Sequence, residues 1–195
     1  MTFGFKDINL IFVFMKKICV FILLILVSLP SFAQGESNVS EEKNVVKINT
    51  LSLIILAPSI FYEREFSDMV SGQLGVGYLN YNIGDTKFTG LILTPEVRLY
   101  LKKNAIDGFY LGPYFRYQNF SLEADDSKAS YTNYGGGLTI GRQWILESGF
   151  TMDLFFGGHY GAGELKVDTG TEDQFDTGKF DGFRTRVGFA IGFAF

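Results

Sequence analysis

Large apolar side chains alternate with small or polar ones over most of the chain after residue 45. The last nine residues, VGFAIGFAF, show this most clearly, because Val187, Phe189, Ile191, Phe193 and Phe195 alternate with Gly and Ala. A period of two residues is typical of a β-strand whose two faces meet different surroundings. The pattern therefore predicts an all-β domain.

Eight segments carry this pattern, separated by short stretches rich in charge, Gly or turn-forming residues. We expect strands over Lys47–Leu56, Ser59–Phe66, Ser71–Tyr81, Gly90–Leu101, Gly108–Phe120, Tyr131–Ile145, Phe150–Ala162 and Phe183–Phe195. Only "APS" separates the first two, so they could also form one long bent strand.

The connections between the segments differ in length. "SDMV", "KKNAID" and "LES" are short, whereas "NIGDTKFT", "SLEADDSKAS" and residues 161–182 are longer and more polar. In outer-membrane barrels short turns face the periplasm and longer loops face outside. An even number of strands also puts both termini on the periplasmic side.

The two faces of each segment predict which side meets lipid. In "LILTPEVRLYL", Leu93, Val97 and Leu99 lie on one face, and Glu96 and Arg98 lie on the other. Elsewhere the polar face is crowded with Gly and Ala, which fit the inside of a narrow closed cylinder. A soluble, lipocalin-like barrel would show the reverse and is the alternative. We predict an eight-stranded antiparallel up-and-down transmembrane β-barrel.

The predicted inner face carries charges of both signs. Isolated buried charges are costly, so we expect these groups to pair and to fill the lumen rather than line a pore. The predicted interior ion-pair network consists of Glu63, Glu96, Arg98, Arg116, Asp153, Arg184 and Arg186. Glu65 falls on the same face, either within the network or at the rim.

Three residues fit this interpretation less simply. Pro95 and Pro113 fall within predicted strands, where proline interrupts the hydrogen-bond ladder, so we expect β-bulges there. Arg142 falls on the lipid face, but near the periplasmic end, where it could reach the membrane surface beside Trp144.

Residues 15–34, MKKICVFILLILVSLPSFAQ, have the charge, short apolar core and small residues of a secretory signal peptide. We predict that residues 1–33 are removed after Ala33 and that translation begins at Met15. An uncleaved inner-membrane anchor is the alternative. Residues 34–45 are predicted to be a disordered periplasmic lead-in and residues 46–195 the barrel.

Cys19 lies in the predicted signal, so the mature chain would have no thiol for disulfides, catalysis or metal binding. Removing residues 1–33 leaves 14 basic and 20 acidic side chains. An acidic exported protein is a poor binder of nucleic acid. We predict no cofactor and no metal.

The stretches "LTPEVRLYL", "GFYLGPYFRY" and "GGGLTIGRQW", with the alternating tail, resemble small outer-membrane β-barrel proteins of Gram-negative bacteria. The similarity is to barrels common in Bacteroidota and, in architecture, to OmpX and the transmembrane domain of OmpA. The resemblance implies contact with outer-membrane lipid and insertion by the outer-membrane assembly machinery. Phe189, Ile191, Phe193 and Phe195 would form the insertion signal. It implies no defined activity.

We expect a monomeric barrel that is not an enzyme and has a structural or surface-interaction role through its outer loops, for an unknown ligand. A lipid-modifying enzyme and a narrow pore are the alternatives. His159, the one histidine, lies on the predicted inner face, with Asp153 six residues and about 20 Å away along the strand. No His-Xaa-Ser sequence follows it, which argues against a catalytic arrangement.

Overall fold

A computed structural model describes residues 42–54, 57–83, 86–102, 104–124, 127–170 and 181–195. The predicted signal peptide and most of the predicted lead-in lie outside these ranges. The strands are β1 Asn44–Asn49, β2 Ser59–Ser67, β3 Val70–Ile83, β4 Thr86–Tyr100, β5 Gly108–Ala124, β6 Ser127–Ile145, β7 Phe150–Thr169 and β8 Gly182–Ala194.

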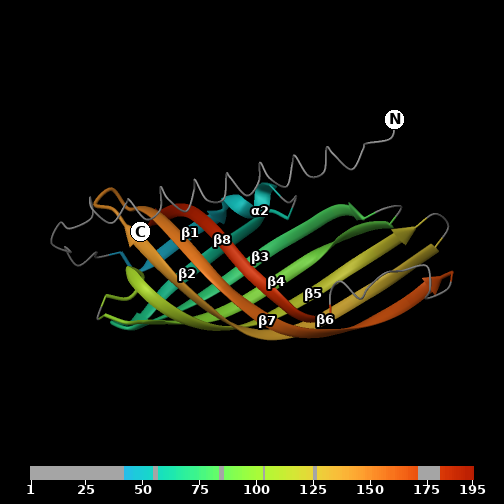
Figure 1. The fold of residues 1–195 in the computed structure, drawn as a ribbon. Helices are drawn as coiled ribbons and strands as arrows, with labels where there is room; N and C mark the ends of the chain where they lie inside the picture. Colours follow the sequence, from blue (N-terminus) through green and yellow to red (C-terminus); the bar gives the residue numbers. More distant parts are fainter. Residues whose placement is uncertain (1–41, 55–56, 84–85, 103, 125–126, 171–180) are drawn as a thin grey trace, which may run out of the picture. The chain divides into compact units, whose positions relative to one another are not determined.

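These eight strands form one closed barrel (Figure 1). Each strand pairs antiparallel with the next in sequence, and β8 pairs with β1 through partners such as Lys47 and Gly192. The predicted all-β, eight-stranded, up-and-down antiparallel fold is confirmed.

The described chain begins and ends at the same end of the barrel. The N–H of Asn44 donates to the carbonyl of Phe195 (3.0 Å), and the N–H of Phe195 donates back to Asn44 (2.8 Å). The connections β2–β3, β4–β5 and β6–β7 lie at this end, which we call the turn end. The opposite end is the loop end.

The first predicted strand is wrong in extent. β1 begins at Asn44, within the predicted lead-in, ends at Asn49 and is followed by the five-residue helix α2, Thr50–Ile54. Asn49 Oδ1 accepts from the N–H of Ser52 (3.4 Å), and the Ser52 hydroxyl donates to the Asn49 carbonyl (2.7 Å). This local capping turns the chain away from the ladder. Among the described residues, no helix has the length and apolar character needed to cross a membrane.

The predicted loops at the loop end are wrong in the opposite sense. Most of 82–89 and 121–130, and residues 161–169, belong to strands, so that β6 has 19 residues and β7 has 20. β1 and β2, with 6 and 9 residues, are much shorter. One side of the barrel therefore extends well beyond the other at the loop end.

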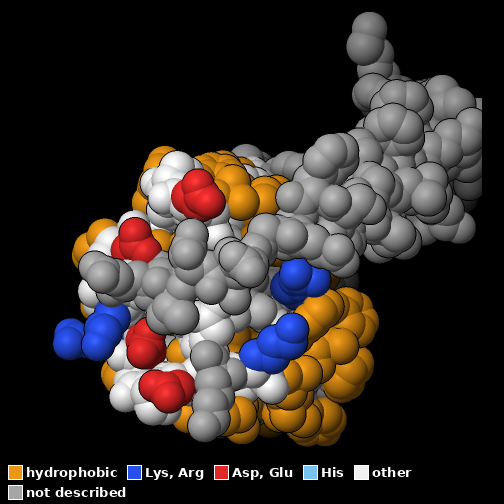
Figure 2. Space-filling view, turned by 90° about the vertical axis from the view of Figure 1, so that its left-hand side faces the viewer, with side chains coloured by type: hydrophobic (Ala, Val, Ile, Leu, Met, Phe, Trp, Pro, Cys, Tyr) orange, Lys and Arg blue, Asp and Glu red, His pale blue; other side chains and the backbone are white. Residues whose placement is uncertain are grey.

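Side chains alternate between the inside and the outside along every strand, as the pattern predicts. Leu138 and Val187 are 56% and 59% exposed on the outside, whereas Arg98 and Asp153 are fully buried inside. Figure 2, viewed toward the turn end, shows charged side chains over the end face and a broad area of hydrophobic side chains on the flank.

The bulges expected at Pro95 and Pro113 are not present. Among the described strands the register shifts at Glu65/Ser67 and Lys128/Ala129 instead. Pro95 stays in register with β3, and Pro113 stays in register with β6. In the part of the β4–β5 ladder that contains the two prolines, Glu96↔Tyr114 is the one pair that remains. Because proline has no N–H, the two residues together weaken one seam of the wall without displacing either strand.

Candidate functional site

A network of charged side chains crosses the inside of the barrel near the turn end. Lys47 Nζ lies 2.6 Å from a Glu63 oxygen and 2.9 Å from an Asp153 oxygen. Arg98 contacts the same two carboxylates at 3.0 and 2.9 Å. All four side chains are fully buried. Two cations and two anions from four strands therefore link opposite walls of the lumen.

Neutral side chains satisfy the remaining oxygens of these carboxylates. The Tyr100 hydroxyl donates to Glu63 (2.7 Å), and the Tyr110 hydroxyl donates to Asp153 (2.8 Å). The Arg98 guanidinium carbon also lies 4.0 Å from the centroid of the Tyr110 ring. A buried ion pair is tolerated only when such contacts satisfy its lone pairs, so the tyrosines are part of the network.

Glu96 extends the network toward the loop end. One of its oxygens accepts from Arg98 Nε (2.8 Å), and the other accepts from Arg186 Nη1 (2.5 Å). Arg186 Nη1 also donates to the hydroxyl of Thr139 (2.9 Å). The connected charges are thus three cations and three anions, which is a neutral set.

The β4–β5 turn closes the lumen below this network. Ala105 and Ile106 are buried, and the carbonyl of Ile106 accepts a hydrogen bond from Gln143 Nε2 (2.7 Å). Ile106 has φ +66°, a conformation that costs a β-branched residue free energy and persists only where surrounding contacts fix it. In the same turn, burial raises the pKa of Asp107, although Arg142 and a backbone hydrogen bond act in the opposite direction.

The structure brings together five of the seven residues predicted for the interior network. Those five are Glu63, Glu96, Arg98, Asp153 and Arg186. Arg116 and Arg184 also lie on the inner face, but neither forms an ion pair with a described carboxylate. Glu65 is partly exposed near the turn end, next to the register shift.

Sequence reasoning missed Lys47 and Gln143. Lys47 Nζ contacts Gln143 Oε1, and both side chains are fully buried. Lys47 alternates with Val46 and Ile48, which are exposed, and this period could have assigned it to the inner face. Its partners come from β2, β6 and β7, and no local pattern identifies them.

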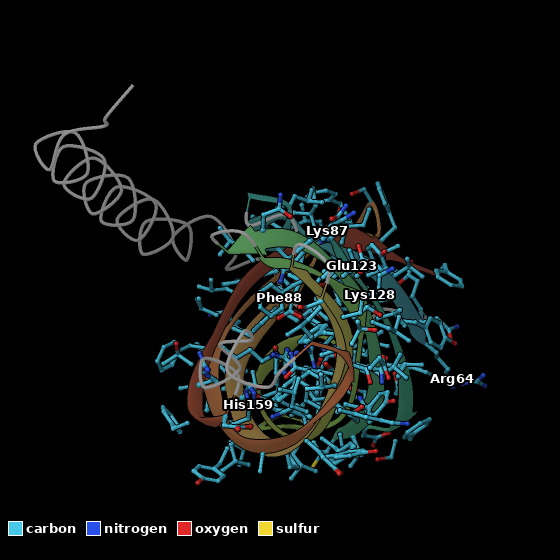
Figure 3. The ribbon with its side chains drawn as sticks, turned by 90° about the vertical axis from the view of Figure 1, so that its right-hand side faces the viewer. Arg64, Lys87, Phe88, Glu123, Lys128 and His159 are labelled. Carbon is cyan, nitrogen blue, oxygen red and sulfur yellow. The ribbon has the colours of Figure 1, made fainter. Side chains whose placement is uncertain are left out.

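His159 lies inside the ring of strands (Figure 3). Its Nδ1 is 3.3 Å from the Tyr114 hydroxyl, which is its one hydrogen-bond partner among the described residues. The described residues contain no group of three His, Cys, Asp or Glu side chains arranged to hold a metal ion.

The inside of the barrel changes character toward the loop end. Phe88, Phe120, Leu122, Ala129 and Tyr131 form a buried apolar cluster, against which Leu79, Ile92, Leu165 and Val167 pack. Phe88, Leu122, Ala129, Leu165 and Val167 come from the strand extensions that were predicted to be loops, and the other members lie at the adjoining ends of the predicted strands. Their apolar side chains point inward at every second position, which explains why the strands continue there.

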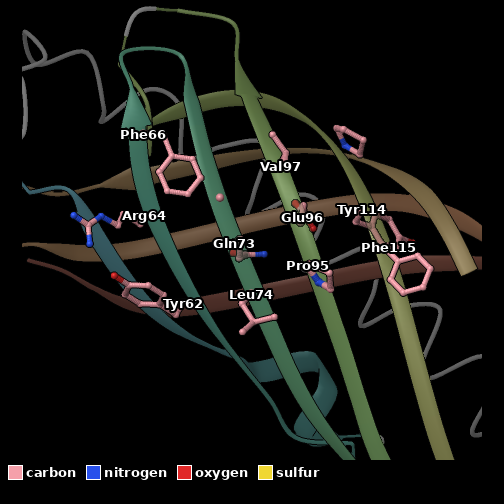
Figure 4. A pocket seen from close by; sticks show the side chains of 12 residues that line it. Tyr62, Arg64, Phe66, Gln73, Leu74, Pro95, Glu96, Val97, Tyr114 and Phe115 are labelled. Carbon is pink, nitrogen blue, oxygen red and sulfur yellow. The ribbon is translucent and has the colours of Figure 1, made fainter. Parts of the chain in front are cut away.

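The outer face carries an apolar groove of about 630 Å³ over β2–β5 (Figure 4). Leu74, Pro95 and Phe115 line it, while Glu96 and Tyr114 reach it from the inner face at the weakened β4–β5 seam. The predicted insertion residues lie on the outside of β8 and directly after its end. Phe193 and Phe195 are 60% and 61% exposed, Ile191 is 37% exposed and Phe189 is partly buried.

Fold and site together define a closed antiparallel β-barrel whose wall is apolar outside and whose lumen holds a neutral ionic network near the turn end. The sequence model of a family described as "Protein of unknown function (DUF3575)" matches residues 19–179, so this chain belongs to that family. No curated protein and no solved structure matches the chain significantly.

Proposed function

We propose that this protein is an outer-membrane β-barrel with a filled interior, and that its role is structural or lies in surface interactions at the loop end. The observation that carries the proposal is the reversal of the usual soluble pattern: bulky apolar side chains cover the outside, and charged side chains are enclosed. Water favours the opposite arrangement, whereas lipid favours this one.

The spacing of aromatic residues along the outer face supports the proposal, because it matches the height of the apolar band of an outer-membrane barrel. Three consecutive strands carry two outward aromatic residues ten positions apart: Tyr134 and Trp144 on β6, Phe150 and Tyr160 on β7, and Phe183 and Phe193 on β8. Ten residues of a tilted strand span about 25 Å, the height of the apolar band in outer-membrane barrels. Such barrels place aromatic girdles at both edges of that band.

The filled interior favours a structural or binding role over conduction. The lumen is crossed by Lys47, Arg98 and their carboxylate partners and is closed by the turn at Ile106. The contacts of His159 do not favour catalysis, because no orienting carboxylate contacts it among the described residues, where its hydrogen-bond partner is Tyr114.

The proposal places the turn end and both termini in the periplasm, and the strand extensions outside the cell. Short turns face the periplasm in barrels of this kind, and extended hairpins face outward. The resemblance to OmpX and to the transmembrane domain of OmpA, and insertion by the outer-membrane assembly machinery, are part of this proposal.

Heat-modifiable migration tests the membrane barrel directly. We expect the mature protein to require detergent or lipid for folding, and the unheated sample to migrate differently from the boiled one on a gel. A mature protein that stays folded and monomeric in buffer without detergent would overturn the proposal. Planar-bilayer measurements should show no conductance, and a steady single-channel current would favour the pore instead.

A further inference from the structure

Three arginines gather inside the barrel on the loop-end side of the ionic network. The guanidinium carbons of Arg186 and Arg116 lie 4.4 and 5.9 Å from the centroid of the Tyr114 ring. The Tyr114 hydroxyl contacts His159, and the Cα of Arg184 is the β8 partner of the Cα of His159. Arg116 and Arg186 therefore lie near the same ring, and Arg184 lies at the β8 position opposite His159.

This arginine cluster, Arg116, Arg184 and Arg186, has more positive charge than its described surroundings balance. Lys47, Arg98 and Arg186 are matched by Glu63, Glu96 and Asp153 in the network below. Arg116 and Arg184 add two further positive charges, and neither pairs with a carboxylate of the described residues.

One carboxylate, that of Asp181, lies at the rim nearby, but its contacts are with other groups. Asp181 Oδ1 accepts hydrogen bonds from the Tyr131 hydroxyl (2.5 Å), Asn133 Nδ2 (3.3 Å) and the N–H of Gly163 (2.8 Å). These contacts tie Asp181 to the rim of β6 and β7, and it forms no ion pair with Arg116 or Arg184 among the described contacts.

The cluster also has hydrogen-bond donors to spare. Arg186 is only 5% exposed, and its Nη2 has no partner among the described residues. Arg116 donates from Nε to the Thr94 hydroxyl at 3.3 Å, which leaves its two terminal nitrogens with no described partner. A buried guanidinium donor without an acceptor, such as Arg186 Nη2, is costly, and the planar fork of arginine fits the oxygens of a phosphate group.

We infer that the arginine cluster binds a phosphate group that enters from the loop end. A dianion would balance the two surplus charges and accept from the unpartnered donors, while the network and the β4–β5 turn stop it from passing further. The group could belong to free phosphate or to a phosphomonoester. The inference requires the closed barrel and its interior, and it does not depend on where the barrel resides.

Titration of the refolded full-length mature barrel with inorganic phosphate tests the inference. The measurement is the midpoint of thermal unfolding at pH 8 and constant ionic strength, with chloride as the replacement anion. We expect the midpoint to rise with phosphate and to saturate, because a ligand that binds the native state stabilises it. Glucose 6-phosphate, used in parallel, separates the two sources: a matching rise indicates a phosphomonoester, and a rise with inorganic phosphate alone indicates the free anion.

The Arg116→Gln/Arg184→Gln double variant is the decisive comparison. It should bind phosphate at least ~10-fold more weakly, since each charge-assisted hydrogen bond contributes roughly one order of magnitude in affinity. Without phosphate it should be as stable as the wild type or more so, because mutual repulsion is relieved. This second expectation separates loss of a ligand site from a folding defect.

Arg142→Gln is the matched control, because Arg142 lies on the outer face between the Phe109 and Trp144 rings, 4.8 and 5.0 Å from their centroids. This variant should keep the full phosphate response. The inference is overturned if the wild type shows no saturable rise with either compound, or if the double variant shows the same rise as the wild type.

Discussion

The two halves of the barrel wall follow opposite rules. Near the turn end, leucine, valine and phenylalanine point outward, and Glu63, Arg98 and Asp153 point inward. In the extensions at the loop end, Phe88 and Phe120 point inward, and charged residues such as those of the hairpin β5–β6 point outward (Figure 3).

For the membrane barrel proposed above, the reversal corresponds to a change of solvent along the same strands. A chain that meets lipid hides its charges, and one that meets water hides its apolar groups. The strands do not change register at this boundary in β4 or β5, so the same alternate positions face inward on both sides of it. What changes across the boundary is whether those inward positions hold charged or apolar residues. The boundary can therefore be located by substitution.

Loss of Arg98 should have the largest effect on stability. Arg98→Met leaves Glu63, Glu96 and Asp153 with fewer cations in a fully buried site, and breaking one partner of a buried network costs about 3–5 kcal/mol. Urea unfolding in lipid vesicles measures this. Arg142→Met, on the outer face, should change stability by less than about 1 kcal/mol. Equal losses in both variants would argue against an energetic role for the network.

A charge on the outer face should distinguish the two halves directly. Leu138→Arg places a cation on the apolar outer surface of β6 and should destabilise the barrel in vesicles by about 2–4 kcal/mol. Ser121→Arg makes the same kind of change on the outer face of the β5 extension and should cost less than about 0.5 kcal/mol. If both variants lost the same amount, the proposed boundary would be misplaced.

Truncation in the apolar cluster should loosen the extension and leave the lower wall intact. Phe120→Ala removes a fully buried ring, a change that costs roughly 3 kcal/mol where the structure cannot relax. Because the extension can open locally, we expect faster proteolysis near the β5–β6 hairpin, with a change of less than about 1 kcal/mol in global unfolding. Limited proteolysis with mass spectrometry separates the two. A global loss as large as that of Arg98→Met would mean that the halves fold as one unit.

The exposed ion pair in the extension should matter least. Lys128 Nζ lies 3.4 Å from Glu123, with the two side chains 65% and 50% exposed. Lys128→Met should change the free energy of unfolding by no more than about 0.5 kcal/mol, because exposed pairs are weak and screened by salt. The same unfolding assay at low and high salt checks this, and a loss above about 2 kcal/mol would contradict it.

Several features were predictable because they depend on local sequence. The period of two identified eight strands, and the faces of "LILTPEVRLYL" were assigned correctly, since the pleat alone decides which residues share a face. The inner position of Arg116 and Arg184 followed in the same way. The sequence did not predict that these two arginines lack carboxylate partners among the described residues. A count of charges on one face says nothing about distances across the lumen.

Other features depended on contacts between distant parts of the chain. The strand extensions had a polar composition typical of loops, and only the packing of Phe88, Leu122 and Ala129 across three strands makes them strands. Hydrogen bonds between Asn49 and Ser52 cap a short helix where the second half of the first strand was expected. A two-residue period does not reveal such a cap.

By itself the sequence determined the all-β architecture and which side chains are enclosed, because both follow from alternation within single strands. The tertiary structure decided that Lys47 is a central member of the network and that the two prolines weaken one seam instead of forming bulges. It also decided that two arginines have no acidic partner among the described residues. The physical reason is that closing the barrel fixes the stagger of all eight strands together, and that stagger determines which side chains meet across the lumen.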